Sequence, residues 1–141
     1  DPTRAAVSPA LAAQIYGLDI LARDIEDTHN NTTRFLVMTA DRDAPAPADG
    51  VDAITSFVFR VRNIPAALYK AMGGFATNGV NMTKLESYME NGSFSATMFY
   101  AEVDGRPQDP PLARALEELT FFADHVEVLG SYPADPFRKT L

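Results

Sequence analysis

The 141-residue sequence contains no cysteine. This absence excludes disulfides, thiolate chemistry and cysteine-based zinc sites. The two histidines, His29 and His125, are too far apart in the chain to show the spacing of metal ligands, so we expect neither a metal nor a cofactor. A chain without cysteine is also compatible with the cytosol, and we expect a cytoplasmic protein.

Long hydrophobic runs and clusters of basic residues are missing too. No apolar run approaches the length of a membrane span. The 19 acidic residues outnumber the 12 Lys and Arg, which gives a formal net charge of −7. Nucleic acids and anionic membranes attract concentrated positive charge, so we expect neither as a partner. A hydrophobic content of 46% and a charged content of 22% are typical of an ordinary globular protein.

The first forty residues predict one helix and one strand. Ser8 suits the N-cap of a helix and Pro9 its first position. Apolar residues then follow at helical spacing as far as Ile25, and residues 33–39 form a β-rich run. A single helix and strand cannot bury both of their faces. We therefore expect this pair to pack on something outside the chain or to remain exposed.

The remainder of the chain predicts a linker and then a regular domain. Residues 41–50 are rich in Pro, Ala and Asp and have no periodicity, which is typical of a semi-rigid linker. The pattern then predicts a strand at 54–61, a helix at 65–78, strands at 80–88 and 94–103, a helix from Asp109-Pro110, and a strand at 125–129. Asn91-Gly92 is a strong hairpin signal. This βαββαβ order predicts an α+β, ferredoxin-like fold.

Several motifs resemble the C-terminal part of prephenate dehydratases. Asn31-Thr32-Thr33-Arg34-Phe35 resembles the Thr-Arg-Phe signature that closes their catalytic domain, and residues 80–87, Val-Asn-Met-Thr-Lys-Leu-Glu-Ser, resemble the signature of their ACT regulatory domain. Residues 63–70 and 129–133 continue the resemblance, which covers nearly the whole chain. It implies four parts: the helix–strand end of an α/β catalytic domain at 1–40, a linker at 41–50, a βαββαβ ACT domain at 51–135, and a tail at 136–141.

The resemblance implies that the intact chain converts prephenate into phenylpyruvate, carbon dioxide and water in L-phenylalanine biosynthesis. Thr33, Arg34 and Phe35 would then belong to the catalytic site. A Thr33 hydroxyl can donate a hydrogen bond to the departing hydroxyl, where negative charge develops. From the residues alone, Thr33 is an ordinary strand residue. Arg34 matches a carboxylate, but alternation along a strand turns it away from Thr33 and favours a salt bridge or interface role. Phe35 is either core or pocket wall.

Members of the family bind phenylalanine between two ACT domains, which implies an effector site here. Its loop would comprise Asn63, Ala66, Ala67 and Leu68, with backbone N–H groups at a helix start that suit a carboxylate. The opposite side would be Asn81, Met82, Thr83, Glu86 and Ser87, with the Asn81 amide oxygen accepting from the ligand ammonium and Leu68 and Met82 flanking its ring. From spacing alone, Leu68 and Met82 are core and Asn81 is a turn residue.

Two motifs depart from the family pattern. The loop commonly contains Gly-Ala-Leu, where this chain has Ala66-Ala67-Leu68. Glycine tolerates backbone conformations and close ligand approach that alanine resists. The strand commonly continues Glu-Ser-Arg-Pro, where this chain has Glu86-Ser87-Tyr88-Met89. These departures leave the fold and dimerisation as expected, but they leave open the strength of feedback and the identity of the effector.

Three functions are compatible with these features. The first is an enzyme that belongs to phenylalanine biosynthesis, the second a free-standing ACT sensor that binds an amino acid, and the third a purely structural dimerisation domain. Residues 10–39 favour the enzyme, because a free sensor has no need of them. The Gly-rich and Glu-Asn-Ser motifs expected in the active site are absent, so we expect a truncated piece that is inactive alone and forms a homodimer through its ACT domain.

Overall fold

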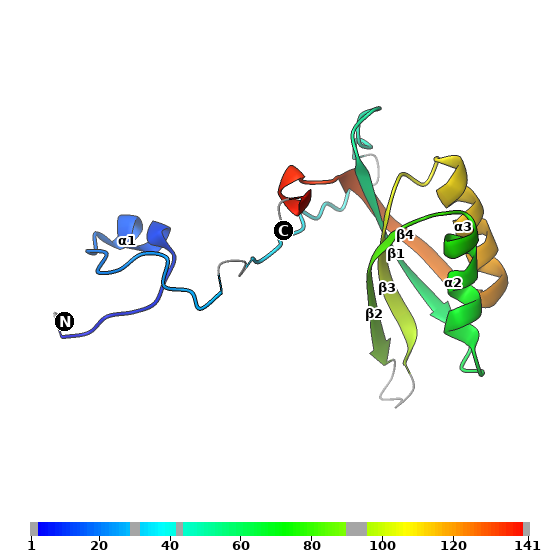
Figure 1. Cartoon of the computed structure of the whole chain (residues 1–141), viewed down its shortest axis with the longest axis horizontal. Coiled ribbons are helices and arrows are strands. Elements are labelled where there is room, and N and C mark those ends of the chain that lie inside the picture. Colours follow the sequence, from blue (N-terminus) through cyan, green and yellow to red (C-terminus); the bar gives the residue numbers. More distant parts are fainter. Residues whose placement is uncertain (1–2, 29–31, 42–43, 90–95, 140–141) are drawn as a thin grey trace. The chain divides into compact units, whose positions relative to one another are not determined.

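The computed structural model describes residues 3–28, 32–41, 44–89 and 96–139 (Figure 1). The chain divides into two compact units, Asp1–Met38 and Thr39–Leu141. The Asn91-Gly92 turn lies outside the described residues.

The first unit contains one short helix, α1 (Ala10–Tyr16). Gly17 ends it in the left-handed conformation, with φ 62° and its N–H donated to the Ala13 carbonyl. The helix is therefore shorter than the apolar spacing, which continues to Ile25, predicts. A left-handed residue ends the series of backbone hydrogen bonds in a helix. None of the residues of α1 is buried. The apolar positions predicted to form one face are all exposed, namely Leu11, Ile15, Leu18, Leu21 and Ile25.

The strand predicted over residues 33–39 is wrong: the described residues 32–39 lie in neither a helix nor a strand. A strand needs a neighbour that supplies the partners for its backbone N–H and carbonyl groups. The run is highly exposed instead, with Phe35 at 85%. The alternation argument that turned Arg34 away from Thr33 and Phe35 therefore has no basis. The expectation that this segment packs outside the chain or remains exposed agrees with its exposure.

The second unit has the predicted α+β, ferredoxin-like order. Its elements are β1 (Ala53–Val61), α2 (Ala67–Thr77), β2 (Met82–Met89), β3 (Ala96–Asp104), α3 (Pro110–Phe122), β4 (Ala123–Pro133) and a terminal 3-10 turn (Pro136–Lys139). The strands form one antiparallel sheet in the order β2-β3-β1-β4. Both long helices cover the same face of that sheet (Figure 1). β4 is longer than the predicted 125–129 and runs along nearly all of β1.

The helix predicted over residues 65–78 ends where expected, because α2 stops at Thr77 and Gly79 follows shortly after. Gly79 has φ 68°, a conformation that favours glycine, and donates its N–H to the Ala76 carbonyl. The next residue, Val80, donates to the Phe75 carbonyl at 2.9 Å. These two bonds satisfy carbonyl groups at the helix end and turn the chain towards β2.

Stacked phenylalanines form the centre of the core between the sheet and the helices. Phe57 and Phe75 stack with ring centroids 5.5 Å apart, and Phe59 and Phe99 stack at 5.2 Å. All four side chains are at most 6% exposed. Burying each such ring stabilises the fold by roughly 1.5–3 kcal/mol. On α3, the buried positions are Leu112, Ala115 and Leu119.

The chain topology determines where each helix lies over the sheet. Because α2 joins β1 to β2, it crosses β3 and covers the β2–β3 half. Because α3 joins β3 to β4, it crosses β1 and covers the β1–β4 half. The two helices contact each other where Gly74 faces α3. A Cβ on Gly74 would lie 2.9 Å from Glu118 Cβ and 3.3 Å from the Ala115 carbonyl oxygen.

This contact predicts opposite effects for two neighbouring substitutions. Gly73→Ala meets no atom within 4 Å, so its better helix propensity should stabilise the chain by up to about 1 kcal/mol. Gly74→Ala should destabilise it by about 1–3 kcal/mol, because the added methyl pushes the helices apart. Urea unfolding of the 141-residue chain measures both. Equal stabilisation by the two variants would contradict the close contact.

Candidate functional site

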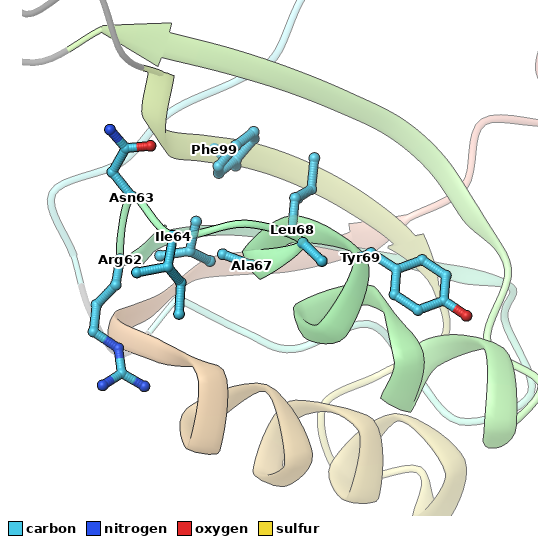
Figure 2. Close-up of a pocket in the computed structure, with 9 residues that line it drawn as sticks. Arg62, Asn63, Ile64, Ala67, Leu68, Tyr69 and Phe99 are labelled. Atoms are coloured by element: carbon cyan, nitrogen blue, oxygen red, sulfur yellow. The ribbon is translucent and has the colours of Figure 1, made fainter.

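A hollow of about 290 Å³ lies where β1 ends and α2 begins (Figure 2). Its lining is Val61, Arg62, Asn63, Ile64, Ala66, Ala67, Leu68, Tyr69 and Phe99. Four of these, Asn63, Ala66, Ala67 and Leu68, are the loop residues expected to contact an effector. The apolar contribution of Phe99 was missed, because it comes from β3 and no local motif connects it to the loop.

The start of α2 lies in this hollow and has an unusual backbone. Ala66 is its N-cap and has φ 61°, a left-handed conformation that costs an L-residue about 1–2 kcal/mol. This is the position at which the family motif commonly has glycine. The N-cap residue, Ala66, makes no side-chain capping hydrogen bond, and the first turn of α2 contains no acidic residue. Its positive dipole end therefore remains available to an anion.

The second predicted part of the site surrounds Asn81, just before β2. The Asn81 amide Nδ2 donates to Asp104 Oδ2 at 2.7 Å, and the Asp104 N–H donates to the Asn81 carbonyl at 3.0 Å. Asp104 is exposed and ends β3. Its carboxylate beside the amide oxygen of Asn81 makes a pair of acceptors that suits an ammonium group. Asp104 was missed because only the β2–β3 pairing brings it beside Asn81.

One chain does not bring the two parts together. The loop precedes α2 and Asn81 follows it, and a helix of 11 residues is about 16 Å long. Leu68 lines the hollow and also packs against the core, whereas Met82 packs against the core only. A ligand that contacts both Leu68 and Asn81 must therefore lie between two copies of the domain.

The other predicted strand residues separate onto the two faces of the sheet. Ser87 pairs with Phe99, and cross-strand partners project to the same face, so Ser87 lies on the side of the hollow. Thr83 Oγ1 lies 3.4 Å from the Glu102 carbonyl oxygen, to which it donates. Glu86 pairs with Tyr100 on the opposite, open face.

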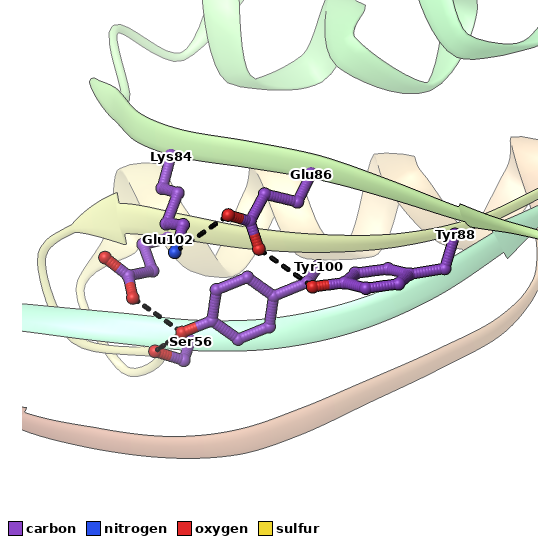
Figure 3. A network of polar contacts seen from close by, with 6 residues as sticks. All are labelled: Ser56, Lys84, Glu86, Tyr88, Tyr100 and Glu102. Atoms are coloured by element: carbon purple, nitrogen blue, oxygen red, sulfur yellow. Dashed lines mark hydrogen bonds and ion pairs between the residues drawn. The ribbon is translucent and has the colours of Figure 1, made fainter. Parts of the chain in front are cut away.

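A polar network covers that open face (Figure 3). Glu86 accepts from the Tyr88 hydroxyl at 2.8 Å and pairs with Lys84 at 3.0 Å. The Tyr88 hydrogen bond, followed by that of Lys84, lowers the pKa of Glu86. Tyr88 stands where the family motif commonly has arginine, so its hydroxyl supplies a donor to the carboxylate from that position. Glu86 therefore acts within the sheet rather than in the hollow.

The deeper part of the network contains a buried carboxyl group. The Tyr100 hydroxyl donates to Glu102 Oε1 at 2.5 Å and lies 3.2 Å from Ser56 Oγ. Glu102 is fully buried and Ser56 is 5% exposed. Burial, with the hydrogen bond to Glu102 second, raises the pKa of Tyr100 to about 12. The network was not predicted, because its members come from three strands and no single segment shows it.

The three predicted catalytic residues lie in the first unit. Thr33, Arg34 and Phe35 are all exposed. Among the described residues, no three His, Asp or Glu side chains are placed to hold a metal ion. Across the same part of the chain, every helix is too short or too polar to span a membrane.

Known proteins match this chain over most of its length. The sequence model of the prephenate dehydratase family matches residues 1–43. A bifunctional N-acyl-homoserine lactone acylase/prephenate dehydratase from Komagataeibacter europaeus is 58% identical, over 95% of this chain and 47% of that protein. A prephenate dehydratase from Corynebacterium glutamicum is 34% identical, over 93% of this chain and 41% of that protein. The chain thus spans less than half the length of these relatives.

Among the solved structures that resemble the chain are the following two. One is described as a novel type of quorum quenching acylase; it is 51% identical, with a TM-score of 0.75, over 92% of this chain and 46% of that one. The other is a prephenate dehydratase from Arthrobacter aurescens in complex with L-Phe. It is 29% identical, with a TM-score of 0.57, over 66% of this chain and 31% of that one.

The raised pKa of Tyr100 predicts how stability depends on alkaline pH. The phenol has an ordinary pKa of 10.0 when unfolded and about 12 when folded, so the unfolded chain loses this proton first. Its contribution to stability is therefore complete below pH 10 and is lost as the pH rises towards 12. Tyr100→Phe should make stability fall less steeply over that range in urea unfolding. Tyr16→Phe, at a 73% exposed position, is the control and should leave the slope unchanged.

Proposed function

This chain is homologous to the C-terminal portion of prephenate dehydratases and contains an ACT-like regulatory domain, and we propose that this domain binds L-phenylalanine as a feedback inhibitor. The observation that carries the proposal is the hollow at the uncapped start of α2, lined by four of the residues that the motif implies. The relative from Arthrobacter aurescens, solved with L-Phe, supports the choice of ligand.

The chemistry of the two parts suits an amino acid with an aromatic side chain. The ligand carboxylate would take the N–H groups at the start of α2, where the helix dipole is positive. The ring would lie against Leu68 and Phe99 in the hollow. The ammonium group would lie at Asn81 and Asp104 of a second copy, where two oxygen acceptors meet.

A homodimer about a two-fold axis provides that second copy. Since α2 and β2 lie on the same side of the domain, pairing two such edges antiparallel sets each loop beside the partner's Asn81. β2 is an edge strand, whose unpaired backbone needs cover. Leu85, Met89 and Tyr69 are exposed along this edge and supply apolar surface.

We further propose that a longer chain containing this one converts prephenate into phenylpyruvate, and that this piece alone is inactive. The match of residues 1–43 to the dehydratase family supports the assignment of Thr33 to the catalytic site. Its hydroxyl would donate to the departing hydroxyl of prephenate, where charge develops in the transition state. The exposed apolar residues of the first unit would then be covered by the rest of the catalytic domain. We propose a cytoplasmic location for that longer chain.

Calorimetric titration of the 141-residue chain tests the effector site. Phenylalanine should bind to a dimer, and Asp104→Asn should weaken its affinity about tenfold or more, since an ionic hydrogen bond to the ammonium group is lost. Glu117→Gln removes the same charge from the exposed side of α3 and should leave the affinity unchanged.

Two further measurements separate the ligand from the assembly. Titrations with tyrosine and tryptophan establish which aromatic amino acid the hollow prefers. Sedimentation then gives the oligomeric state. A dimer that gives no heat with phenylalanine would retain the architecture and reject the effector, whereas a monomer at high micromolar concentration would reject both.

A chimera tests the catalytic assignment. This chain replaces the matching C-terminal residues of the Komagataeibacter europaeus relative, and phenylpyruvate formation is followed by ultraviolet absorbance. Thr33→Ala should lower kcat about a hundredfold and change KM little, because a transition-state hydrogen bond is lost. Thr32→Ala, one residue earlier, is the matched control. A near-normal kcat for Thr33→Ala would make Thr33 a structural residue, and turnover by the 141-residue chain alone would show that the missing part is dispensable.

A second candidate activity is hydrolysis of N-acyl-homoserine lactones. The observation that favours it is the 58% identity to a protein whose name includes that acylase. The same chimera distinguishes the two activities, because release of the free homoserine lactone is measured beside phenylpyruvate formation. Loss of the acylase alone in the chimera would assign its determinants to residues that differ between the two C-terminal portions.

A further inference from the structure

Residues 47–52, which we name the strap, lie against the regulatory domain rather than extending freely from it. Pro47 is buried. The carbonyl groups of Ala48 and Val51 both accept from Arg106 Nη2, the latter at 2.9 Å. The Val51 N–H donates to the Ala48 carbonyl at 3.3 Å, so the strap makes a turn around the guanidinium. At its end, Asp52 accepts from the Ala134 N–H at 2.8 Å.

Arg106 is itself held firmly by the loop between β3 and α3. Its N–H donates to Asp109 Oδ2 at 2.7 Å, and its carbonyl accepts from the Asp109 N–H at 2.9 Å. The preceding Gly105 donates its N–H to the Ala53 carbonyl at 2.8 Å and accepts from Thr55 Oγ1 at 2.7 Å. The φ of Gly105 is 105°, which strains any residue with a Cβ. The side chain of Arg106 therefore projects from a rigid base.

The geometry around the guanidinium indicates that its position has a cost. The Arg106 Nε is buried and meets no acceptor among the described residues. A buried donor without an acceptor is unfavourable. The guanidinium that binds the two carbonyl groups of the strap has thus given up hydration at its Nε. This cost indicates that the position of Arg106 does more than keep a charged residue in solvent.

The base of Arg106 continues directly into the effector site. Asp104 precedes Gly105 and is joined to Asn81 by two hydrogen bonds, one from the side chain and one from the backbone. The path from Asn81 to the strap therefore consists of Asp104, Gly105 and Arg106, three consecutive residues, and then the carbonyl groups of Ala48 and Val51.

We infer that Arg106 is a positioning residue that clamps the strap, and that an effector bound at Asn81 and Asp104 tightens this clamp. The inference rests on the effector site proposed above. A ligand ammonium that restrains Asp104 also restrains its two neighbours, and the strap loses freedom with them. Ligand occupancy is thereby transmitted to the segment through which the chain enters the regulatory domain. The coupling needs no change of fold, only a change in how often the strap opens.

Arginine suits this role better than lysine. A planar guanidinium can meet two carbonyl oxygens while its stem remains fixed, whereas an ammonium on a flexible stem acts as a point charge. Arg106→Lys should therefore retain the charge and lose most of the clamp. Arg106→Gln removes the charge as well, and comparison of the two separates geometry from electrostatics.

Hydrogen exchange of the 141-residue chain, with and without saturating L-phenylalanine, tests the clamp and the coupling. Without ligand, the Val51 amide, which donates to the Ala48 carbonyl, should exchange about tenfold faster in Arg106→Gln than in the unaltered chain, since hydrogen bonds from a charged donor to the two strap carbonyl groups are lost. With ligand, the unaltered chain should gain protection in the strap, and Arg106→Gln and Arg106→Lys should not. Arg114→Gln removes an exposed α3 arginine and should behave as the unaltered chain does.

Each outcome decides a separate part of the inference. If the strap exchanges at the same rate without ligand in Arg106→Gln and in the unaltered chain, the clamp is overturned. It is also overturned if Arg106→Gln accelerates exchange in β1 as much as in the strap. Phenylalanine that binds, by calorimetry, without added strap protection would overturn the coupling and leave the effector site intact. Absence of binding heat would reject the effector site and the coupling together, while the ligand-free comparison still decides the clamp.

Discussion

Burial of stacked phenylalanines beneath two helices is the constraint on which the rest of this structure depends. Phe57 and Phe59 of β1 meet Phe75 of α2 and Phe99 of β3, so that one set of stacked rings joins the two central strands to α2. The loop before α2 is therefore fixed at one end of the sheet, and Asn81 at the other. Both parts of the proposed effector site derive their positions from this core, and their separation is the reason for proposing a second copy of the domain.

The two departures from the family motif acquire physical meanings in the structure. Ala66 adopts φ 61°, so the backbone retains the conformation for which glycine is the usual residue, at a cost of about 1–2 kcal/mol. Strain of this kind concentrates at functional sites. Tyr88 replaces arginine but donates to Glu86, so the carboxylate on the open face still has a partner there. Each substituted position thus keeps one feature of the family motif, the left-handed backbone at Ala66 and a donor to Glu86 at Tyr88.

The two units show how far a segment depends on its surroundings. The second unit has its own core and keeps nearly every predicted element, because helical and strand periodicities there bury complementary faces. The first unit has the patterns of a helix and a strand but only seven residues of helix and no strand between 32 and 39. Its apolar residues are exposed and form no buried face of the kind found in the second unit. A periodic pattern therefore predicts an element only where a partner is present.

Periodicity, capping and motifs are local properties, so the βαββαβ order, the end of α2 near residue 78, the loop residues of the hollow and the resemblance to prephenate dehydratases could all be predicted from the amino-acid sequence. Tertiary structure alone decided that Phe99 lines the hollow, that Asp104 lies beside Asn81, that Glu102 is buried beneath Tyr100, and that Arg106 holds the strap. Each of these contacts joins segments far apart in the chain. Strand register and chain crossing create such neighbours, and a linear pattern contains neither.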